Sequence, residues 1–195
     1  MKPVLVTLTS KTVGESFIFP YERGMKPRLL PVYKVPLYQI NVGATRTFKA
    51  VRFGLTPLIM PPPHERVCNV GLNAAQILTP EWVPGYGPHS FTGGELRGAW
   101  RLKPGQQFLI HQGATREENQ LGGSLGCVEL AGSAEWKSFM QAVQMETGVS
   151  SFAEIAQRRL LRVDVQATSF PMAILDSIYD RDTGLSSPAP GSDHR

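Results

Sequence analysis

The sequence has few cysteines, few histidines and no long apolar run. Cys68 and Cys127 are the only cysteines among 195 residues, so disulfides cannot hold a fold of this size together, and their spacing matches no zinc or thioredoxin pattern. The four histidines lie far apart, so we expect no metal site and no cofactor. The first apolar run, residues 4–9, is too short for a signal peptide, and no segment is long enough for a membrane span.

Charge is also sparse and nearly balanced. Charged residues make up 18% of the chain, and 20 basic against 16 acidic side chains give a formal net charge of +4. The basic residues are scattered rather than gathered into a stripe or an arm, which argues against nucleic acid as a partner. The hydrophobic fraction of 42% suffices for the core of a soluble globular domain. We expect a single domain over residues 1–179.

Glycine and proline, by contrast, are abundant, with 19 and 16 residues. They separate short runs rich in Val, Ile, Phe and Tyr, a pattern typical of β-strands and of the turns between them. The fold class that we expect is mainly β with a few helices (α+β). The predicted strands cover residues 4–9, 16–19, 32–42, 47–53, 98–102, 107–111 and 160–167.

Two helices are predicted, both after the midpoint of the chain. The first begins near Ser133 as N-cap, has apolar residues every three or four positions, and ends at Gly148. The second opens with Ser151 and Glu154 in a capping-box pattern and continues to Gln157. Both apolar stripes are interpreted as parts of the core rather than as cofactor sites.

Two further segments differ in composition from the rest of the chain. Residues 55–97 are rich in proline and glycine and are predicted to form a long irregular insertion, which its aromatic residues keep ordered. A binding loop and a surface excursion without a role are both left as interpretations of this insertion. Residues 180–195 have little apolar content, so we expect a disordered tail.

The residues with the clearest chemical potential are His111 and Cys127. His111 closes an apolar strand, and Cys127 lies in a turn bounded by glycines. A strand end followed by a loop that turns back brings the imidazole and the thiol within reach of each other. Because a free thiol is mostly protonated at neutral pH, a neighbouring imidazole must take its proton. The spacing therefore predicts Cys127 as a nucleophile and His111 as its base.

Small residues around the cysteine fit the same chemistry. Gly126 allows a sharp turn, so the backbone amides of Gly126 and Cys127 are candidates for an oxyanion site. Ser124 is a candidate to orient the imidazole or to line the cleft. A lone cysteine is most often only a small buried apolar side chain, and that is the role we expect for Cys68.

The segments Ile110-His111-x-Gly113 and Ser124-x-Gly126-Cys127-Val128 resemble the catalytic signature of the L,D-transpeptidases of the YkuD type. The resemblance covers residues 47–167 in general organisation, but only residues 111–130 in specific motif. Two positions depart from the family pattern: Gln112 separates His111 from Gly113, and Glu129 stands where the family commonly has arginine. The resemblance implies an L,D-transpeptidase-like β-sandwich or barrel.

It also implies an activity. The Cys127 thiolate would attack the amide between the L-centre and the D-residue of a peptidoglycan tetrapeptide stem, release the terminal D-amino acid and leave a thioester. An amine acceptor then gives transpeptidation or D-amino-acid exchange, and water gives L,D-carboxypeptidase trimming. Candidates for contact with the stem peptide are Gly113, Glu129, Tyr86 and His89.

The site of action is a separate question, because peptidoglycan lies outside the cytoplasmic membrane. Some members of this superfamily are antibacterial effectors of type VI secretion that are delivered into the periplasm of a competitor. We therefore hypothesise a protein that is made in the cytoplasm without a signal peptide and acts in the periplasm. Its partners would be the secretion machinery and a cognate immunity protein that plugs the cleft.

Two other functions are kept as alternatives. One is a different peptidase or amidase, with histidine before cysteine in the chain, that cuts wall peptides at another bond. The other is a noncatalytic module that binds the cell wall or belongs to a phage tail, in which Cys127 is only structural. Thiol reactivity separates them. A depressed pKa and fast alkylation at Cys127, lost in His111→Ala, favour the enzyme, whereas equally slow labelling of Cys68 and Cys127 favours the module.

Overall fold

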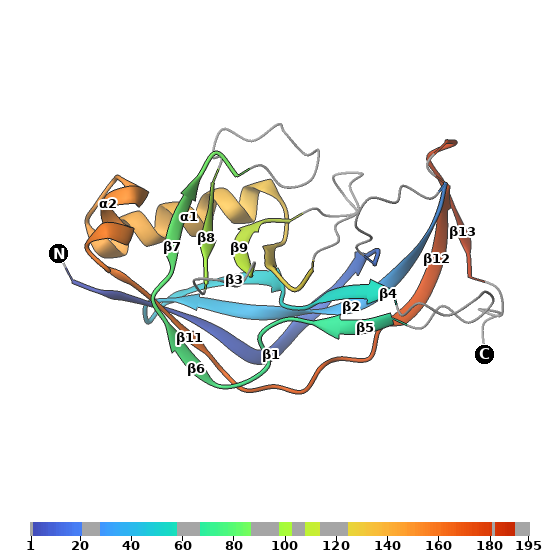
Figure 1. Ribbon diagram of the computed structural model, residues 1–195, viewed down its shortest axis with the longest axis horizontal. Helices are drawn as coiled ribbons and strands as arrows, with labels where there is room; N and C mark the ends of the chain where they lie inside the picture. The colour runs from blue at the N-terminus through green and yellow to red at the C-terminus, as the bar shows by residue number, and fades with distance from the viewer. Residues whose placement is uncertain are drawn as a thin grey trace.

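The computed structural model describes residues 2–20, 28–57, 67–86, 98–102, 108–113, 125–180 and 182–189. In this part of the chain, one large curled sheet dominates and two helices lie beside one end of it (Figure 1). The predicted fold class, mainly β with a few helices, is confirmed. No helix within the described ranges is long and apolar enough to span a bilayer.

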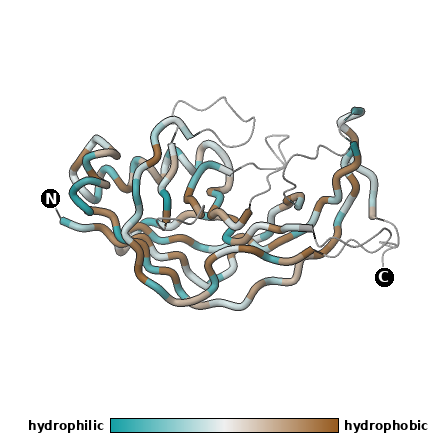
Figure 2. Tube along the Cα trace, viewed as in Figure 1, coloured by the Kyte–Doolittle hydropathy of each residue, from teal (hydrophilic) through white to brown (hydrophobic). Residues whose placement is uncertain are grey.

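Two long strands form the backbone of the sheet. β1 (Val4–Ile18) and β2 (Leu29–Val42) pair antiparallel, and β3 (Arg46–Val51) pairs antiparallel with β2. Apolar and polar residues alternate along these strands, as Figure 2 shows, because successive side chains point to opposite faces of a sheet. The sequence predicts two strands where β1 is one, because the irregular register between Leu8 and Gly14 interrupts the alternation.

The sheet is completed by strands that are distant in sequence. Its order is β6-β11-β1-β2-β3-β10-β9-β8-β7. The pair β12-β13 joins this sheet through β12, which pairs with residues 29–34 of β2, the part that β3 does not reach. A separate two-stranded sheet consists of β4 (Gly54–Pro57) and β5 (Val67–Val70). The other strands are β6 (Gln76–Leu78), β7 (Glu81–Pro84), β8 (Gly98–Arg101), β9 (Leu109–Gln112), β10 (Val128–Leu130), β11 (Leu161–Val165), β12 (Ile174–Asp180) and β13 (Leu185–Pro188).

Both helices form close to where local signals predict them. Helix α1 (Ser133–Thr147) has Gly132 rather than Ser133 as its N-cap, and Gly148 ends it in the left-handed conformation with φ of 70°. Helix α2 (Phe152–Gln157) begins after Ser151, whose hydroxyl accepts a hydrogen bond from the backbone N–H of Glu154 at 3.3 Å. The predicted end of the first helix and start of the second are therefore confirmed.

The main hydrophobic core lies between α1 and one face of the sheet. Trp136, Phe139 and Met140 of α1 are at most 1% exposed. The Trp100 indole N–H of β8 lies 3.4 Å from the Met140 sulfur, and the Phe139 ring meets Phe48 of β3 edge-on at 5.6 Å. Burial of each large apolar side chain contributes roughly 1.5–3 kcal/mol, so this core holds β3, β8, β9 and β10 in fixed positions under the helix.

The prediction of an irregular insertion over residues 55–97 is wrong for its described parts. β5 and β7 lie within it, and β6 pairs with β11 while β7 pairs with β8, so both ends of the main sheet come from this segment. Pro57 and Pro84 end strands rather than interrupt them. Short edge strands depend on partners that are distant in sequence, so composition alone does not reveal them.

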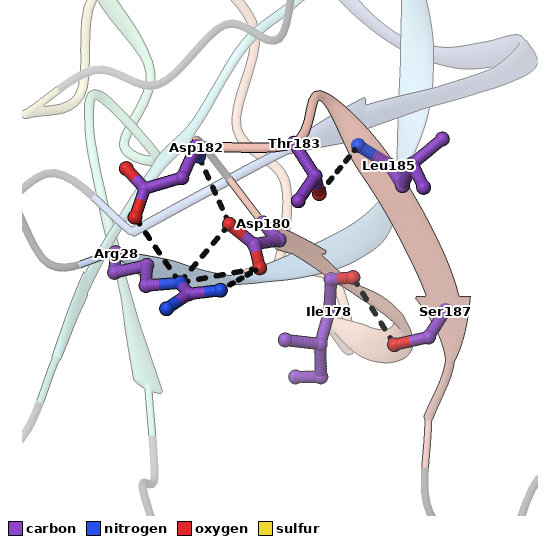
Figure 3. Close-up of polar contacts among 7 residues, drawn as sticks. All are labelled: Arg28, Ile178, Asp180, Asp182, Thr183, Leu185 and Ser187. Atoms are coloured by element: carbon purple, nitrogen blue, oxygen red, sulfur yellow. Dashed lines mark hydrogen bonds and ion pairs between the residues drawn. The ribbon is translucent and has the colours of Figure 1, made fainter.

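The prediction of a disordered tail over residues 180–195 is wrong for residues 182–189. β13 pairs with β12, and the side chains of Arg28, Asp180 and Asp182 cluster at the turn of this hairpin (Figure 3). The Arg28 guanidinium lies 2.9 Å from the Asp180 carboxylate and 3.2 Å from that of Asp182. This polar contact at the surface, together with backbone pairing, orders a segment that has little apolar content.

Candidate active site

The candidate site is built on the parallel pair β9 and β10. Their register places Glu129 opposite His111 and Val128 opposite Ile110. Because side chains alternate along a strand, Ile110 and Val128 point into the core under α1, whereas His111 and Glu129 share the opposite face. Cys127 directly precedes β10 and clusters with Leu109 of β9, which places the thiol on the same face as His111.

His111 is buried and held by the backbone. Its side chain is 1% exposed, and its Nδ1 lies 2.7 Å from the carbonyl oxygen of Gln112. A carbonyl oxygen can only accept, so Nδ1–H is the donor, and this tautomer makes Nε2 the basic nitrogen of the ring. The orienting group is therefore a main-chain oxygen, which leaves no signature in the sequence. Ser124, the side chain predicted for this role, lies outside the described residues.

Glu129 faces the basic nitrogen of His111. The Glu129 side chain is 5% exposed, and its Oε1 lies 3.9 Å from His111 Nε2. At this separation the carboxylate and the imidazole form an ion pair only when the imidazole is protonated. The sequence predicts Glu129 as a residue in contact with the stem peptide, and the structure places it beside the predicted base. Only the strand register, which sequence reasoning did not fix, reveals this pairing.

Cys127 is a buried thiol. It is 7% exposed and packs with Ala99, Leu109 and Tyr86. Burial raises the pKa of Cys127 to about 12; a hydrogen bond with the Leu109 backbone opposes this rise, and the Glu129 carboxylate adds to it. The thiol is therefore neutral at pH 7 in the structure. The depressed pKa that would mark a preformed thiolate is not found here.

Gly126 is required by the turn that leads to Cys127. Its φ is 95°, in the left-handed region, and a Cβ at this position would lie 2.8 Å from the Val70 carbonyl carbon and oxygen and 2.7 Å from the Phe108 ring. The predicted need for glycine before Cys127 is thus confirmed by geometry. The turn packs directly against the backbone of β5.

Two of the other predicted residues also lie at this face. The Tyr86 ring, half-buried, lies 5.3 Å from the His111 ring between centroids and packs against the Cys127 cluster. Gly113 N–H donates to the Leu130 carbonyl at 2.9 Å, and a Cβ at Gly113 would lie 2.7 Å from Cβ of Glu129. Gly113 therefore permits close packing of β9 on β10. His89 lies outside the described residues.

The described residues hold no group of three or more His, Cys, Asp and Glu side chains that could bind a metal ion. The side chains that the structure brings to this face are a thiol, an imidazole held in one tautomer, and a carboxylate beside the imidazole. Comparison of the chain with protein-family models, curated proteins and solved structures finds no match.

Proposed function

We propose that the protein is a cysteine acyltransferase that acts on peptidoglycan tetrapeptide stems, as an L,D-transpeptidase, an L,D-carboxypeptidase or a D-amino-acid exchange enzyme. The observation that carries the proposal is the parallel pairing of β9 and β10, which brings Cys127, His111 and Glu129 to one face. The bond and the substrate come from the resemblance of residues 111–130 to the L,D-transpeptidase signature.

The proposed reaction begins with proton transfer from the Cys127 thiol to Nε2 of His111. The sulfur forms a bond to the stem carbonyl carbon, and the resulting oxyanion lies against the amides of Gly126 and Cys127. The C–N bond then breaks, and His111 returns the proton to the departing amine of the terminal D-residue. An amine or water finally attacks the thioester, gives its proton to His111, and releases the Cys127 thiol.

The raised pKa of Cys127 shapes this mechanism. Because the buried thiol is neutral at rest, His111 must act as a general base during attack rather than as the partner of a preformed thiolate. Glu129, 3.9 Å from Nε2, then stabilises the imidazolium that forms. Tyr86 packs against both Cys127 and His111, so this side chain has to yield when a stem peptide approaches the sulfur.

The noncatalytic module stays as a second candidate, and one specific observation favours it. A thiol with 7% exposure and a pKa of about 12 is what a purely structural cysteine would show. The paired carboxylate and oriented imidazole on the same face are not needed for such a role, and for this reason the enzyme is preferred.

The proposal includes a place of action. Its substrate lies outside the cytoplasmic membrane, so the protein would act in the periplasm, as an effector delivered by type VI secretion and neutralised by an immunity protein. Expression of the chain in a bacterium with an added periplasmic signal should lyse or slow the cells, whereas cytoplasmic expression should not. Equal growth in both cases contradicts the effector role.

The activity is tested by mass spectrometry of purified stem tetrapeptides incubated with the protein. We expect loss or exchange of the terminal D-alanine with the wild-type chain and with Cys68→Ala, and no change with Cys127→Ala. Cleavage at a different bond, dependent on Cys127, assigns another Cys-His peptidase. Absence of any change with stems and with whole sacculi favours the module.

A further inference from the structure

Arg52 is a buried cation that directly follows β3. Its side chain is 1% exposed, and its guanidinium donates to the backbone of three separate parts of the chain. Nη1 donates to the carbonyl oxygens of Leu8 at 3.3 Å and Thr9 at 2.8 Å, both in β1. Nη2 donates to the carbonyl oxygen of Leu72 at 3.0 Å and to that of Gln166, just after β11.

The partners of this guanidinium are main-chain oxygens. Every hydrogen bond that Arg52 makes among the described residues goes to a backbone carbonyl. Burial lowers the pKa of Arg52, but a guanidinium keeps its proton in neutral water. A buried charge is costly unless its donors are satisfied. Nη1 and Nη2 have carbonyl partners, whereas Nε has no hydrogen-bond partner among the described residues. The planar fork fixes the directions of the bonds from Nη1 and Nη2. Arg52 therefore determines where these three segments lie relative to β3.

One of these segments supports the turn that contains Cys127. Leu72 follows Val70 and Gly71, and a Cβ at Gly126 would lie 2.8 Å from the Val70 carbonyl. A Cβ at Gly71 would lie 3.4 Å from the Gly126 carbonyl oxygen, 3.2 Å from the Arg52 carbonyl oxygen and 2.8 Å from the Phe53 ring. The Val70–Leu72 backbone thus packs closely against Arg52 and Phe53 and also against the Gly126 turn.

We propose that Arg52 is a positioning residue for Cys127, which acts by fixing the 70–72 backbone on which the Gly126–Cys127 turn rests. Its value for catalysis rests on the function proposed above, whereas the coupling between Arg52 and the thiol does not depend on any substrate. Arg52 has no signature in the sequence, because its hydrogen-bond partners are main-chain carbonyls, which every residue has.

The test measures the rate of alkylation of Cys127 by iodoacetamide relative to that of Cys68 in the same molecule, over a range of pH. Arg52→Met removes the hydrogen-bond donors and keeps much of the aliphatic part of the side chain. Arg52→Lys keeps the positive charge without the planar guanidinium. Release of the turn should admit water to the thiol, and each unit by which its pKa falls increases the thiolate about tenfold. We expect the Cys127:Cys68 ratio to rise about tenfold in Arg52→Met and less in Arg52→Lys.

The control separates this coupling from general loss of stability. Ile155 of α2 is fully buried in the main core, and no hydrogen bond of Arg52 goes to α2. Ile155→Ala destabilises the fold, and we expect it to leave the ratio unchanged. If Arg52→Met does not fold, Gly71→Ala, which keeps Arg52, should raise the ratio in the same way. An unchanged ratio in folded Arg52→Met or in Gly71→Ala overturns the proposal, and so does an equal rise in Ile155→Ala.

The alkylation ratio and the stem assay together distinguish failure of this proposal from failure of the proposed function. A raised ratio with no reaction of stem peptides would retain Arg52 as the positioning residue and reject the peptidoglycan enzyme. Stem turnover by the wild-type chain, together with an unchanged ratio in Arg52→Met, would retain the enzyme and reject the role of Arg52.

Discussion

At the scale of single residues, the proposed role of His111 as a base depends on its contact with Glu129. The Gln112 carbonyl fixes the tautomer through Nδ1, and the Glu129 carboxylate lies 3.9 Å from Nε2, the nitrogen that would receive the thiol proton. In the proposed mechanism, the Glu129 carboxylate lies beside the positive charge that develops on the imidazole during attack. The same carboxylate disfavours a thiolate at Cys127.

Glu129→Gln is accordingly predicted to have two opposite effects. Turnover of stem peptides should fall by about ten- to a hundredfold, because general-base steps contribute on the order of 10²–10⁴ and the imidazolium loses its counter-charge. Alkylation of Cys127 should become modestly faster, because one cause of its raised pKa is gone. Both rates are measured on the same preparation. Equal loss of both rates would show that the substitution only distorts the site.

Some residue-scale features of the site follow from the sequence and others do not. Cys127, His111 and the glycine before the cysteine carry their own chemical signal, and the structure brings the first two to one face. The Gln112 carbonyl has no such signal, because any residue has a carbonyl oxygen. The position of Glu129 depends on the register of two strands separated by a long connection, which the sequence does not determine.

At the scale of elements, the turn before β10 is a contact between two backbones. A methyl group at Gly126 would overlap the Val70 main chain at 2.8 Å and would require φ of 95° from a residue that rarely adopts it. Gly126→Ala should therefore destabilise the fold by more than about 1 kcal/mol and reduce stem turnover more than its loss of stability explains. Urea unfolding and the stem assay measure the two effects. Gly148→Ala provides the matched control, since its left-handed site has no neighbour within 4 Å.

Helix α1 packs on the face of β9 and β10 that is opposite to His111 and Glu129. Phe139 is fully buried, stacks on Trp136 at 5.7 Å and meets Phe48 of β3 edge-on. Phe139→Ala should cost about 3–5 kcal/mol of unfolding free energy, the usual cost of removing a buried aromatic ring. Calorimetry or denaturant unfolding gives the value. A cost below about 1 kcal/mol would mean that α1 does not hold the sheet as described.

Local signals explain why helices are predicted better than strands. Gly148 and the Ser151–Glu154 cap are contained within a few residues, and the structure has them where the sequence places them. β6 and β7 consist of three and four residues and exist because β11 and β8 pair with them. Pairing between distant segments is a property of the fold, so composition led to the wrong prediction of an irregular insertion.

At the scale of the whole molecule, the neutral Cys127 thiol links stability to pH. Because burial raises its pKa from an ordinary value near 9 to about 12, the folded state binds the proton more tightly than the unfolded chain. The contribution of the protonated thiol to the free energy of unfolding is fully present below pH 9 and is lost as the pH rises from 9 to 12. The wild-type chain should therefore lose unfolding free energy there by up to about 1.4 kcal/mol per pH unit relative to Cys127→Ala. Parallel pH profiles of the two proteins would contradict the buried, protonated thiol.

The arrangement of the whole sheet also favours a rigid site. β9 and β10 lie inside the strand order, between β8 and β3, and α1 covers their other face. His111 lies in β9 and Cys127 directly precedes β10. Side chains supported by such interior strands are held more precisely than side chains on loops. The fold class is predicted from composition, whereas this central position of the site strands depends on the topology alone.

The central claim, that Cys127 forms an acyl intermediate with a peptidoglycan stem, is tested most directly by intact-protein mass spectrometry during reaction with a tetrapeptide stem. We expect an adduct on Cys127 whose mass equals that of the stem less its terminal D-amino acid. The adduct should be absent in Cys127→Ala and in His111→Ala, with Cys68 unmodified. Two results would contradict a covalent role for Cys127. One is stem turnover that shows no adduct and persists in Cys127→Ala, and the other is the absence of both adduct and turnover in the wild-type chain.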